Sequence, residues 1–295
     1  MKYHDDIINP FYACPSGHFF ILLKEKNMKI IKNTKEKCPL VHCITNYVTV
    51  NDVANIILAC GGSPIMADEI NEVKDMQTIC NALVINIGTL NERTLNAMIE
   101  AGKTANALNH PVVLDPVGCG ATPYRTKVIK TLLDEIHFDV IKGNISEIKA
   151  LIFNSNKTKG VDASSLDLVT DDNLDETIAF TKKLSKITKS IIAITGPIDV
   201  ICDENKAYYC LNGTKAMGKI TGTGCMTAGV VASYLAANPE NKLEAVAKSI
   251  AAVGLCGEIS EKNAVGTGSL HIGLIDAMSN LDDDMLNEGQ QLYER

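Results

Sequence analysis

The segment KITGTGCMTAG, Lys219–Gly229, brings together residue types that could do chemistry at one point of the chain. Gly222 and Gly224 lack a Cβ, so their backbone N–H groups can approach a ligand closely. The apolar run after them predicts a helix over 225–237, and a helix begins with free N–H donors and a partial positive charge. The segment therefore predicts an anion site suited to a phosphoryl group during its transfer.

Cys225 stands where this predicted helix begins. The positive end of a helix favours the thiolate form of a cysteine, and a thiolate can accept the proton of a substrate hydroxyl. The alternative is purely structural: a glycine-rich entry to a helix that carries a buried cysteine. A short glycine pattern does not by itself separate the two.

Charged residues follow two predicted strands in the middle of the chain. Asp115 follows PVVL, and Glu147 comes shortly after DVIKGN, so two carboxylates at one sheet edge could hold Mg²⁺. Lys142 could pair with a phosphate as a point charge, and Thr195, which ends SIIAIT, could contact a nucleotide. Each residue also has a structural alternative. Asp115 could fix a turn and Glu147 could occupy the first turn of a helix, whereas Lys142 could be solvated and Thr195 could cap the end of a strand.

Short apolar runs alternate with helical patterns, which predicts an α/β fold with a mostly parallel central sheet and helices on both faces. Right-handed crossovers then place the strand C-termini at one edge, where ligands of such sheets bind. The predicted strands are 39–44, 63–66, 82–88, 111–117, 139–144 and 190–196, with a hairpin over 199–211. The predicted helices are 51–60, 69–81, 91–109, 124–137, 145–153, 174–187, 225–237, 242–262 and 270–278.

Composition and missing motifs exclude several classes of protein. A net charge of −7 disfavours a general nucleic-acid binder, and no apolar run reaches the roughly 20 residues of a membrane span. Ten cysteines without a CxxC pair disfavour zinc and favour a reducing, cytoplasmic compartment. AGKTA at 101–105 lacks the first glycine of a phosphate-binding P-loop, and no GxGxxG or GxSxG motif follows a strand.

The first 27 residues differ from the rest of the chain. They contain the apolar patch HFFILL but neither a basic region before it nor a small-residue cleavage site, so a signal peptide is not expected. The segment that begins with Met28 would be a natural start of the protein. Residues 1–27 are therefore interpreted as an extension or a misassigned start, or alternatively as a short docking arm, and 28–295 as a single domain. The polar segment 154–165 is expected to be a loop or lid.

From about Pro39 to the C-terminal helix the motifs resemble those of the hydroxyethylthiazole kinase family, a thiamine-salvage family of the ribokinase-like superfamily. The matching motifs are HCITNYVTVNDVANIILACGGSPIMADE, ALVINIGTL, VVLDPVGCGATPYRT, IKGNISEI, KGVD, AITGPIDVI and TGTGCMTAG. The resemblance implies a ribokinase-like domain that uses Mg²⁺ and transfers the γ-phosphate of ATP to the alcohol of 5-(2-hydroxyethyl)-4-methylthiazole. It also implies a homotrimer with active sites between subunits.

The resemblance further implies roles for single residues. The implied thiazole contacts are Met66, Gly222 and Asn46, and the implied ATP contacts are Lys142 and Thr195. The implied acidic pair near Mg²⁺ and the phosphates is Asp115 and Glu147, and the implied catalytic group is Cys225 with Gly222 and Gly224. Two residues depart from the usual pattern, in which arginine stands at Lys142 and alanine is common at Thr223.

Three other functions are compatible with the residues. A ribokinase-like relative could phosphorylate a different alcohol, such as hydroxymethylpyrimidine. A small-molecule sensor could keep the fold without the chemistry, although Asp115, Glu147 and Cys225 argue against that. A cysteine hydrolase would use Cys225 as nucleophile, but it needs a partner base. His42 lies near this sheet edge, but nothing in the sequence places it beside Cys225.

Overall fold

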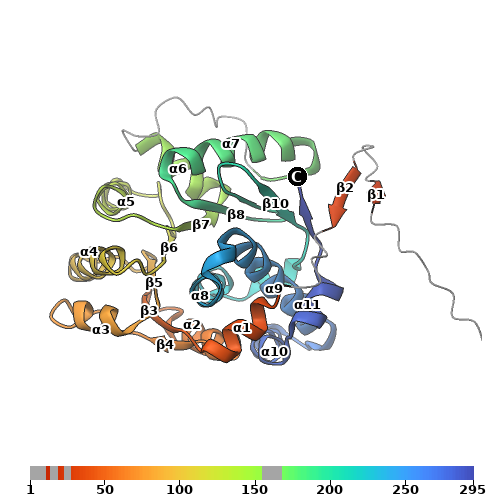
Figure 1. The fold of residues 1–295 in the computed structure, drawn as a ribbon, viewed down its shortest axis with the longest axis horizontal. Helices are drawn as coiled ribbons and strands as arrows, with labels where there is room; N and C mark the ends of the chain where they lie inside the picture. Colours follow the sequence, from red (N-terminus) through yellow and green to blue (C-terminus); the bar gives the residue numbers. More distant parts are fainter. Residues whose placement is uncertain (1–10, 14–18, 23–27, 155–167) are drawn as a thin grey trace, which may run out of the picture.

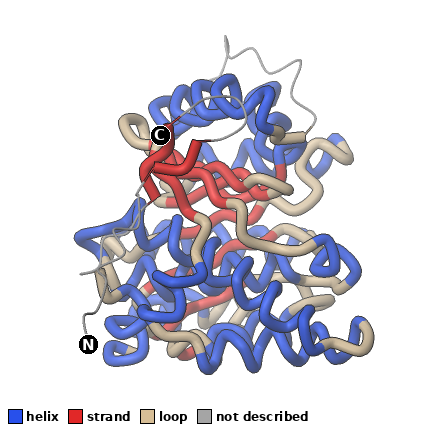
Figure 2. The backbone as a smooth tube through the Cα atoms, turned by 90° about the vertical axis from the view of Figure 1, so that its right-hand side faces the viewer, coloured by secondary structure: helices blue, strands red, loops and turns tan. Residues whose placement is uncertain are grey.

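The computed structural model describes residues 11–13, 19–22, 28–154 and 168–295. Within these residues, eleven strands form one sheet in the order β1-β2-β11-β10-β9-β8-β7-β6-β5-β3-β4 (Figure 1). Seen from the side, the strands make an inner layer enclosed by helices (Figure 2). The predicted loop or lid at 154–165 falls, apart from its first residue, outside the described residues.

The strands from β4 to β8 run parallel, and those beyond β8 run antiparallel. The parallel strands are β3 (Leu40–Ile44), β4 (Ser63–Ile65), β5 (Ala82–Asn86), β6 (Val112–Asp115), β7 (Val140–Asn144) and β8 (Ile191–Thr195). The antiparallel strands are β9 (Asp199–Cys202), β10 (Ala207–Cys210), β11 (Leu292–Glu294), β2 (Phe19–Leu22) and β1 (Phe11–Ala13). The mostly parallel centre and the hairpin are as predicted from the sequence.

Helices cover both faces of the sheet (Figure 1). One face carries α3 (Val73–Ile79), α4 (Glu92–Ala107), α5 (Pro123–Glu135), α6 (Ile145–Asn154) and α7 (Leu174–Thr188). The other carries α1 (Ile30–Lys37), α2 (Val50–Ala59), α8 (Thr223–Ala237), α9 (Lys242–Asn263), α10 (Thr267–Asn280) and α11 (Asp283–Gly289). Alternate strand residues enter the two cores: Val84 packs toward α8, whereas Leu83 and Ile85 pack toward α4.

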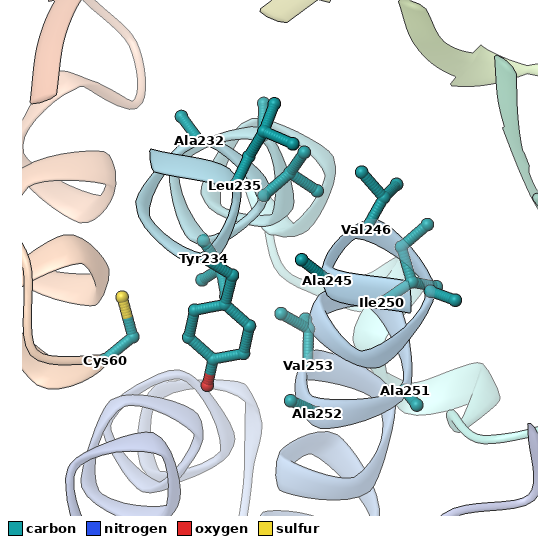
Figure 3. Packing of buried hydrophobic residues seen from close by; sticks show 14 of the residues in the cluster. Cys60, Ala232, Tyr234, Leu235, Ala245, Val246, Ile250, Ala251, Ala252 and Val253 are labelled. Atoms are coloured by element: carbon teal, nitrogen blue, oxygen red, sulfur yellow. The ribbon is translucent and has the colours of Figure 1, made fainter. Parts of the chain in front are cut away.

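Helix α8 is the central helix of its layer and is buried on nearly every side from Met226 onward. Its Tyr234 lies between Cys60 and the residues of α9 (Figure 3). Gly229 allows α2 to approach closely, because a Cβ there would stand 2.9 Å from Cγ1 of Ile57. This packing holds the N-terminus of α8 in a set position relative to the sheet.

Several elements differ from the sequence-based expectation. Helices α1 and α11 and strands β1, β2 and β11 were not predicted. Helix α1 is rich in lysine and buries only Ile30, Ile31 and Thr34, and the other four elements have three to seven residues each. Helix α8 begins at Thr223, two residues before the predicted start, and α3 covers only residues 73–79 of its predicted range 69–81. No helix in the described part of the chain has the length and apolar character to cross a membrane.

Candidate active site

The register of the parallel strands brings polar residues together at one sheet edge. Asn86 at the end of β5 lies opposite Asp115 at the end of β6, and Asn144 of β7 lies opposite Thr195 of β8. Side chains alternate along a strand, so Asp115 points to the same face as Val113, which packs toward α8. The strand ends and the N-terminus of α8 therefore meet on one side of the sheet.

A cavity of about 400 Å³ lies at this meeting point. It is lined by most of the predicted site residues: Asn46, Asp115, Lys142, Glu147, Thr195, Gly222, Gly224 and Cys225. Met66 is not among its lining residues; it follows β4, at the outer edge of the parallel strands, and packs against the core next to α8. The strand-end arrangement thus assembles every predicted site residue except Met66 around one space.

A second cavity of about 570 Å³ adjoins the first and shares Thr195 and Gly224 with it. Its walls include Asp199, Asn212 and Thr223. Both volumes are in the range of small-molecule sites in proteins. The two cavities offer room for two ligands that meet at the start of α8.

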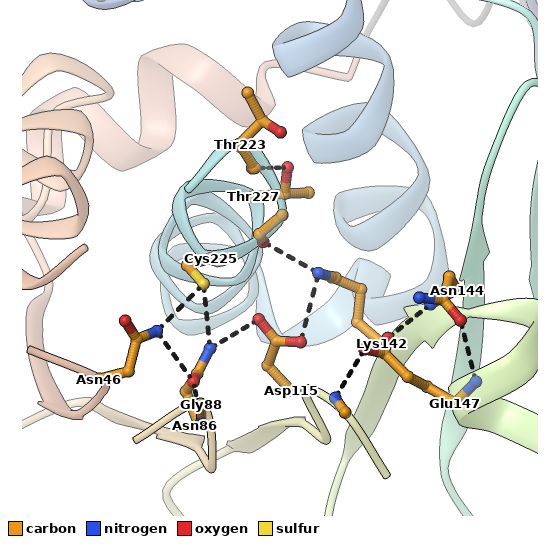
Figure 4. A network of polar contacts seen from close by, with 12 residues as sticks. Asn46, Asn86, Gly88, Asp115, Lys142, Asn144, Glu147, Thr223, Cys225 and Thr227 are labelled. Carbon is orange, nitrogen blue, oxygen red and sulfur yellow. Dashed lines mark hydrogen bonds and ion pairs between the residues drawn. The ribbon is translucent and has the colours of Figure 1, made fainter. Parts of the chain in front are cut away.

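Cys225 faces two side-chain amides (Figure 4). Nδ2 of Asn46 donates to Sγ at 3.2 Å, and Nδ2 of Asn86 donates to Sγ at 3.3 Å. Asn46 is itself held, since its Oδ1 accepts from the backbone N–H and the hydroxyl of Thr49, both at 3.1 Å. The sulfur is therefore a fixed group in the wall of the cavity.

His42 does not assist Cys225. Its imidazole is fully buried and lies within hydrogen-bond distance of the Gln77 side chain, at 3.0 Å, and of the Ala67 carbonyl, at 2.8 Å. Both ring nitrogens are occupied by these partners. Among the described residues, no imidazole is hydrogen-bonded to Cys225, as a cysteine hydrolase would require.

Gly222 is the N-cap of α8 and has a φ of +89°, a conformation that side chains rarely adopt. A Cβ on this residue would stand 2.9 Å from Cγ2 of Thr49. The first N–H groups of a helix have no partner within the helix, so those after Gly222 can bind an anion. Glycine is thus required at this position both by conformation and by space.

Lys142 is buried, with 2% of the residue exposed, which rules out a solvated lysine. Its Nζ donates to the Gly224 carbonyl at 2.9 Å and lies 3.5 Å from Oδ1 of Asp115 (Figure 4). Burial raises the pKa of Asp115, the charge of Lys142 opposes that rise, and Glu147 adds to it. A positive charge therefore sits between an acidic side chain and the start of α8.

The Glu147 carboxylate is held by two backbone amides. Its Oε1 accepts from the N–H of Gly118 and its Oε2 from the N–H of Asn144, both at 2.9 Å. Asp115 accepts at Oδ2 from Nδ2 of Asn86 at 2.8 Å. Two fixed carboxylates facing one cavity fit Mg²⁺, which binds one or two carboxylates and completes its shell with phosphates and water.

Asp199 is a buried acid that the sequence did not single out, because it starts a strand of the hairpin. Its side chain lines the second cavity, and Oδ1 accepts from the N–H of Gly196 at 2.9 Å. Burial raises the pKa of Asp199 to about 7, although that hydrogen bond and the charge of Lys142 oppose the rise.

We expect Asp199→Asn to become more stabilising as the pH rises. The folded protein holds this proton up to about pH 7, whereas the unfolded chain loses it near the ordinary value of 3.8, so Asp199 contributes less stability as the pH rises between these values. The free energy of unfolding of the variant, relative to that of the wild type, should increase by roughly 2–3 kcal/mol from pH 5 to pH 8. Urea unfolding of both proteins at pH 5 and pH 8 measures this change. The same difference between variant and wild type at both pH values would contradict a raised pKa of Asp199.

Asn86, Thr49 and Arg125 are further site residues that the sequence did not identify. Asn86 had a recognisable signal, since it is a polar residue at the end of an otherwise apolar strand, in a segment expected at the ligand edge. Thr49 and Arg125 had none, because their contacts with Gly222 and with distant carbonyls come from chain folding.

Comparisons with known proteins point to one family. The sequence model of the Hydroxyethylthiazole kinase family matches residues 31–284. A hydroxyethylthiazole kinase of Clostridium acetobutylicum is 52% identical over 270 residues, which are 90% of this chain and 97% of that protein. The solved structure of a hydroxyethylthiazole kinase protein from Pyrococcus horikoshii OT3 has a TM-score of 0.81 at 33% identity, covering 90% of this chain and 97% of that one.

A more distant solved structure bears on the fold alone. A ribokinase-like superfamily protein from Enterococcus faecalis has a TM-score of 0.60 at 13% identity, over 84% of this chain and 88% of its own. The ribokinase-like fold predicted from the sequence is confirmed.

Proposed function

Because the chain belongs to the hydroxyethylthiazole kinase family, we propose how its site transfers a phosphoryl group. The protein is a kinase of the thiamine pathway that uses ATP to phosphorylate the alcohol of 5-(2-hydroxyethyl)-4-methylthiazole. The proposal concerns the residues that do this. The observation that carries it is the position of Cys225 in the same cavity as Asp115, Lys142 and Glu147.

We propose that ATP occupies the second cavity, with its γ-phosphate at the boundary marked by Thr195 and Gly224. Those two residues line both cavities, so a phosphate there is within reach of either ligand. The N–H groups at the start of α8 stabilise the oxygens of the transferred group, and Lys142 adds a full positive charge. Lysine supplies that charge without the planar fork of an arginine.

The thiazole alcohol occupies the first cavity, with its hydroxyl toward Cys225. The sulfur accepts the hydroxyl proton as the oxygen attacks the γ-phosphorus, and the bond from that phosphorus to the bridging oxygen of ADP breaks, so that ADP leaves. The amides of Asn46 and Asn86 hold the sulfur in place. The transition state of phosphoryl transfer is loose, so positioning and charge stabilisation supply most of the catalysis.

Asp115 and Glu147 would hold Mg²⁺, which supplies charge neutralisation at the β- and γ-phosphates. Their fixed geometry supports this role, since each carboxylate already has backbone or amide donors that orient it. Lys142 keeps the charges in balance beside Asp115 when the nucleotide is absent.

We propose a homotrimer with active sites between subunits. Exposed apolar side chains lie at the cavity and on α10: Val48, which follows the exposed Tyr47, lines the cavity. Ile272 on α10 adjoins His271, whose Nε2 lies 3.2 Å from the Asp52 carboxylate on α2. Exposed apolar patches mark interaction surfaces. A second subunit there would also explain a thiazole contact from Met66, which does not line the cavity within one chain. Sedimentation equilibrium tests the mass against three times 31.8 kDa.

We further propose that residues 28–295 form one kinase domain, that residues 1–27 are an extension, and that the enzyme works in the cytoplasm. The nine cysteines in the described part of the chain are free thiols, which suits a reducing compartment.

A coupled assay of ADP release tests the function. It compares hydroxyethylthiazole, hydroxymethylpyrimidine and no acceptor, each with ATP and with or without Mg²⁺. Release that needs both the thiazole and Mg²⁺ is the expected result. A folded protein that binds the thiazole but releases no ADP with any acceptor would instead be a sensor.

A further inference from the structure

Arg125 makes an unusual set of contacts with the backbone. It lies in the first turn of α5, on the face of the sheet opposite α8. Its Nη1 donates to the carbonyls of Ile87, at 2.6 Å, and Val117, at 2.7 Å. Its Nη2 donates to the carbonyl of Gly88 at 2.7 Å. One guanidinium thus joins two turns, 87–89 after β5 and 116–118 after β6.

The planar fork of arginine is needed for this arrangement. Its nitrogens donate in fixed directions, so three carbonyls from two turns can be bound at once. A lysine has one ammonium at the end of a flexible stem and cannot hold the same three oxygens in place. Among the described residues, Arg125 has no carboxylate in an ion pair with it, so its charge is used on backbone carbonyls.

Each of the two turns also orients one carboxylate of the site. In the first turn, the N–H of Gly88 donates to Oδ1 of Asn86 at 2.9 Å, and Nδ2 of Asn86 donates to Asp115 at 2.8 Å. In the second turn, the N–H of Gly118, next to Val117, donates to Glu147 at 2.9 Å. The same Asn86 amide also faces Cys225.

We propose that Arg125 is a positioning residue: by tying these turns together it sets the spacing between Asp115 and Glu147. The inference rests on the proposed function, in which these two acids hold Mg²⁺. Loss of the guanidinium lets the turns move apart, so the acids bind the metal–nucleotide complex less well. The thiazole contact at Gly222 lies on α8 and stays in place, whereas Asn46 contacts the first turn through Asn86, to whose Oδ1 it donates at 3.1 Å.

The test compares Arg125→Lys and Arg125→Ala with Lys127→Ala, a control in the same helix whose side chain is exposed. Near-ultraviolet circular dichroism checks the folding of each variant. For Arg125→Lys we expect kcat to fall about 10- to 100-fold and half-saturating Mg²⁺ to rise about 10-fold. The KM for the thiazole should change less than the Mg²⁺ requirement, because Gly222 keeps its place on α8.

Two measurements separate positioning from a general loss of structure. Mn²⁺ binding followed by electron paramagnetic resonance, with a non-hydrolysable ATP analogue, should weaken in Arg125→Lys without any turnover. Guanidinium at low, non-denaturing concentration should partly restore the activity of Arg125→Ala and leave Lys127→Ala unchanged. If Arg125→Ala does not fold, Arg125→Lys and the Mn²⁺ measurement carry the test.

Asp115→Asn and Glu147→Gln separate this inference from the proposed function. If those variants keep wild-type turnover and Mg²⁺ dependence, the acidic pair is not the metal site and the proposed function is overturned at that point. If they lose turnover while Arg125→Lys matches Lys127→Ala in kcat, Mg²⁺ requirement and Mn²⁺ affinity, the inference about Arg125 alone is overturned.

Discussion

Gly222→Val is expected to lower kcat/KM by about 10³-fold or more, because it closes the start of α8 to both the phosphoryl group and the alcohol. A β-branched residue at a φ of +89° is strained, and its Cβ would stand 2.9 Å from Cγ2 of Thr49. Steady-state kinetics with the thiazole measures the loss. Thermal unfolding checks that the strain, on the order of 1–3 kcal/mol, leaves a folded protein.

A graded series separates conformational strain from steric conflict. Gly222→Ala keeps the strained φ but adds only a methyl group, and Thr49→Ser removes the Cγ2 that this methyl would meet. The serine keeps the hydroxyl that donates to Asn46. The double variant should therefore recover part of the activity that Gly222→Ala loses. A folded Gly222→Val enzyme with more than a tenth of the wild-type turnover would contradict the anion site at this helix start.

Cys225→Ser is expected to lower kcat about 10²-fold while the KM values for the thiazole and ATP stay within about 3-fold. A serine hydroxyl fills nearly the same space and still accepts from the amides of Asn46 and Asn86, but it is a much weaker base than a thiolate. Single-turnover kinetics separates the chemical step from binding. Cys38→Ser is the control, because Cys38 is exposed and precedes β3, whereas the site lies at the C-terminal ends of the strands.

Unchanged turnover in Cys225→Ser would remove the base role and leave the fold and the anion site intact. Alkylation followed by mass spectrometry provides an independent test of the position of Cys225. The thiazole should protect Cys225 and leave the labelling of Cys38 unchanged. Equal labelling of Cys225 with and without the thiazole would place the alcohol elsewhere.

The sequence by itself determined the layer order and the edge that carries the site. Unbroken apolar strands such as 82–86 require helices on both faces, and right-handed crossovers bring the ends of parallel strands to one edge. Asp115, Glu147 and Thr195 could be selected for this reason, since each lies at or just after a strand end. Cys225 and its glycines were candidates because a glycine-rich helix start allows close approach to an anion, although the same pattern also suits a structural helix entry.

Only the tertiary structure decided which of these groups touch and which support them. The burial of Lys142 between Asp115 and the Gly224 carbonyl depends on how α8 packs on β5 and β6, next to β7, and joins residues 82 positions apart. The contact of Thr49 with Gly222, the raised pKa of Asp199 and the three carbonyls bound by Arg125 likewise arise between distant segments. The local sequence pattern indicates the periodicity and the ends of a helix or strand. Contacts, burial and charge environment depend instead on the close packing of side chains from several elements.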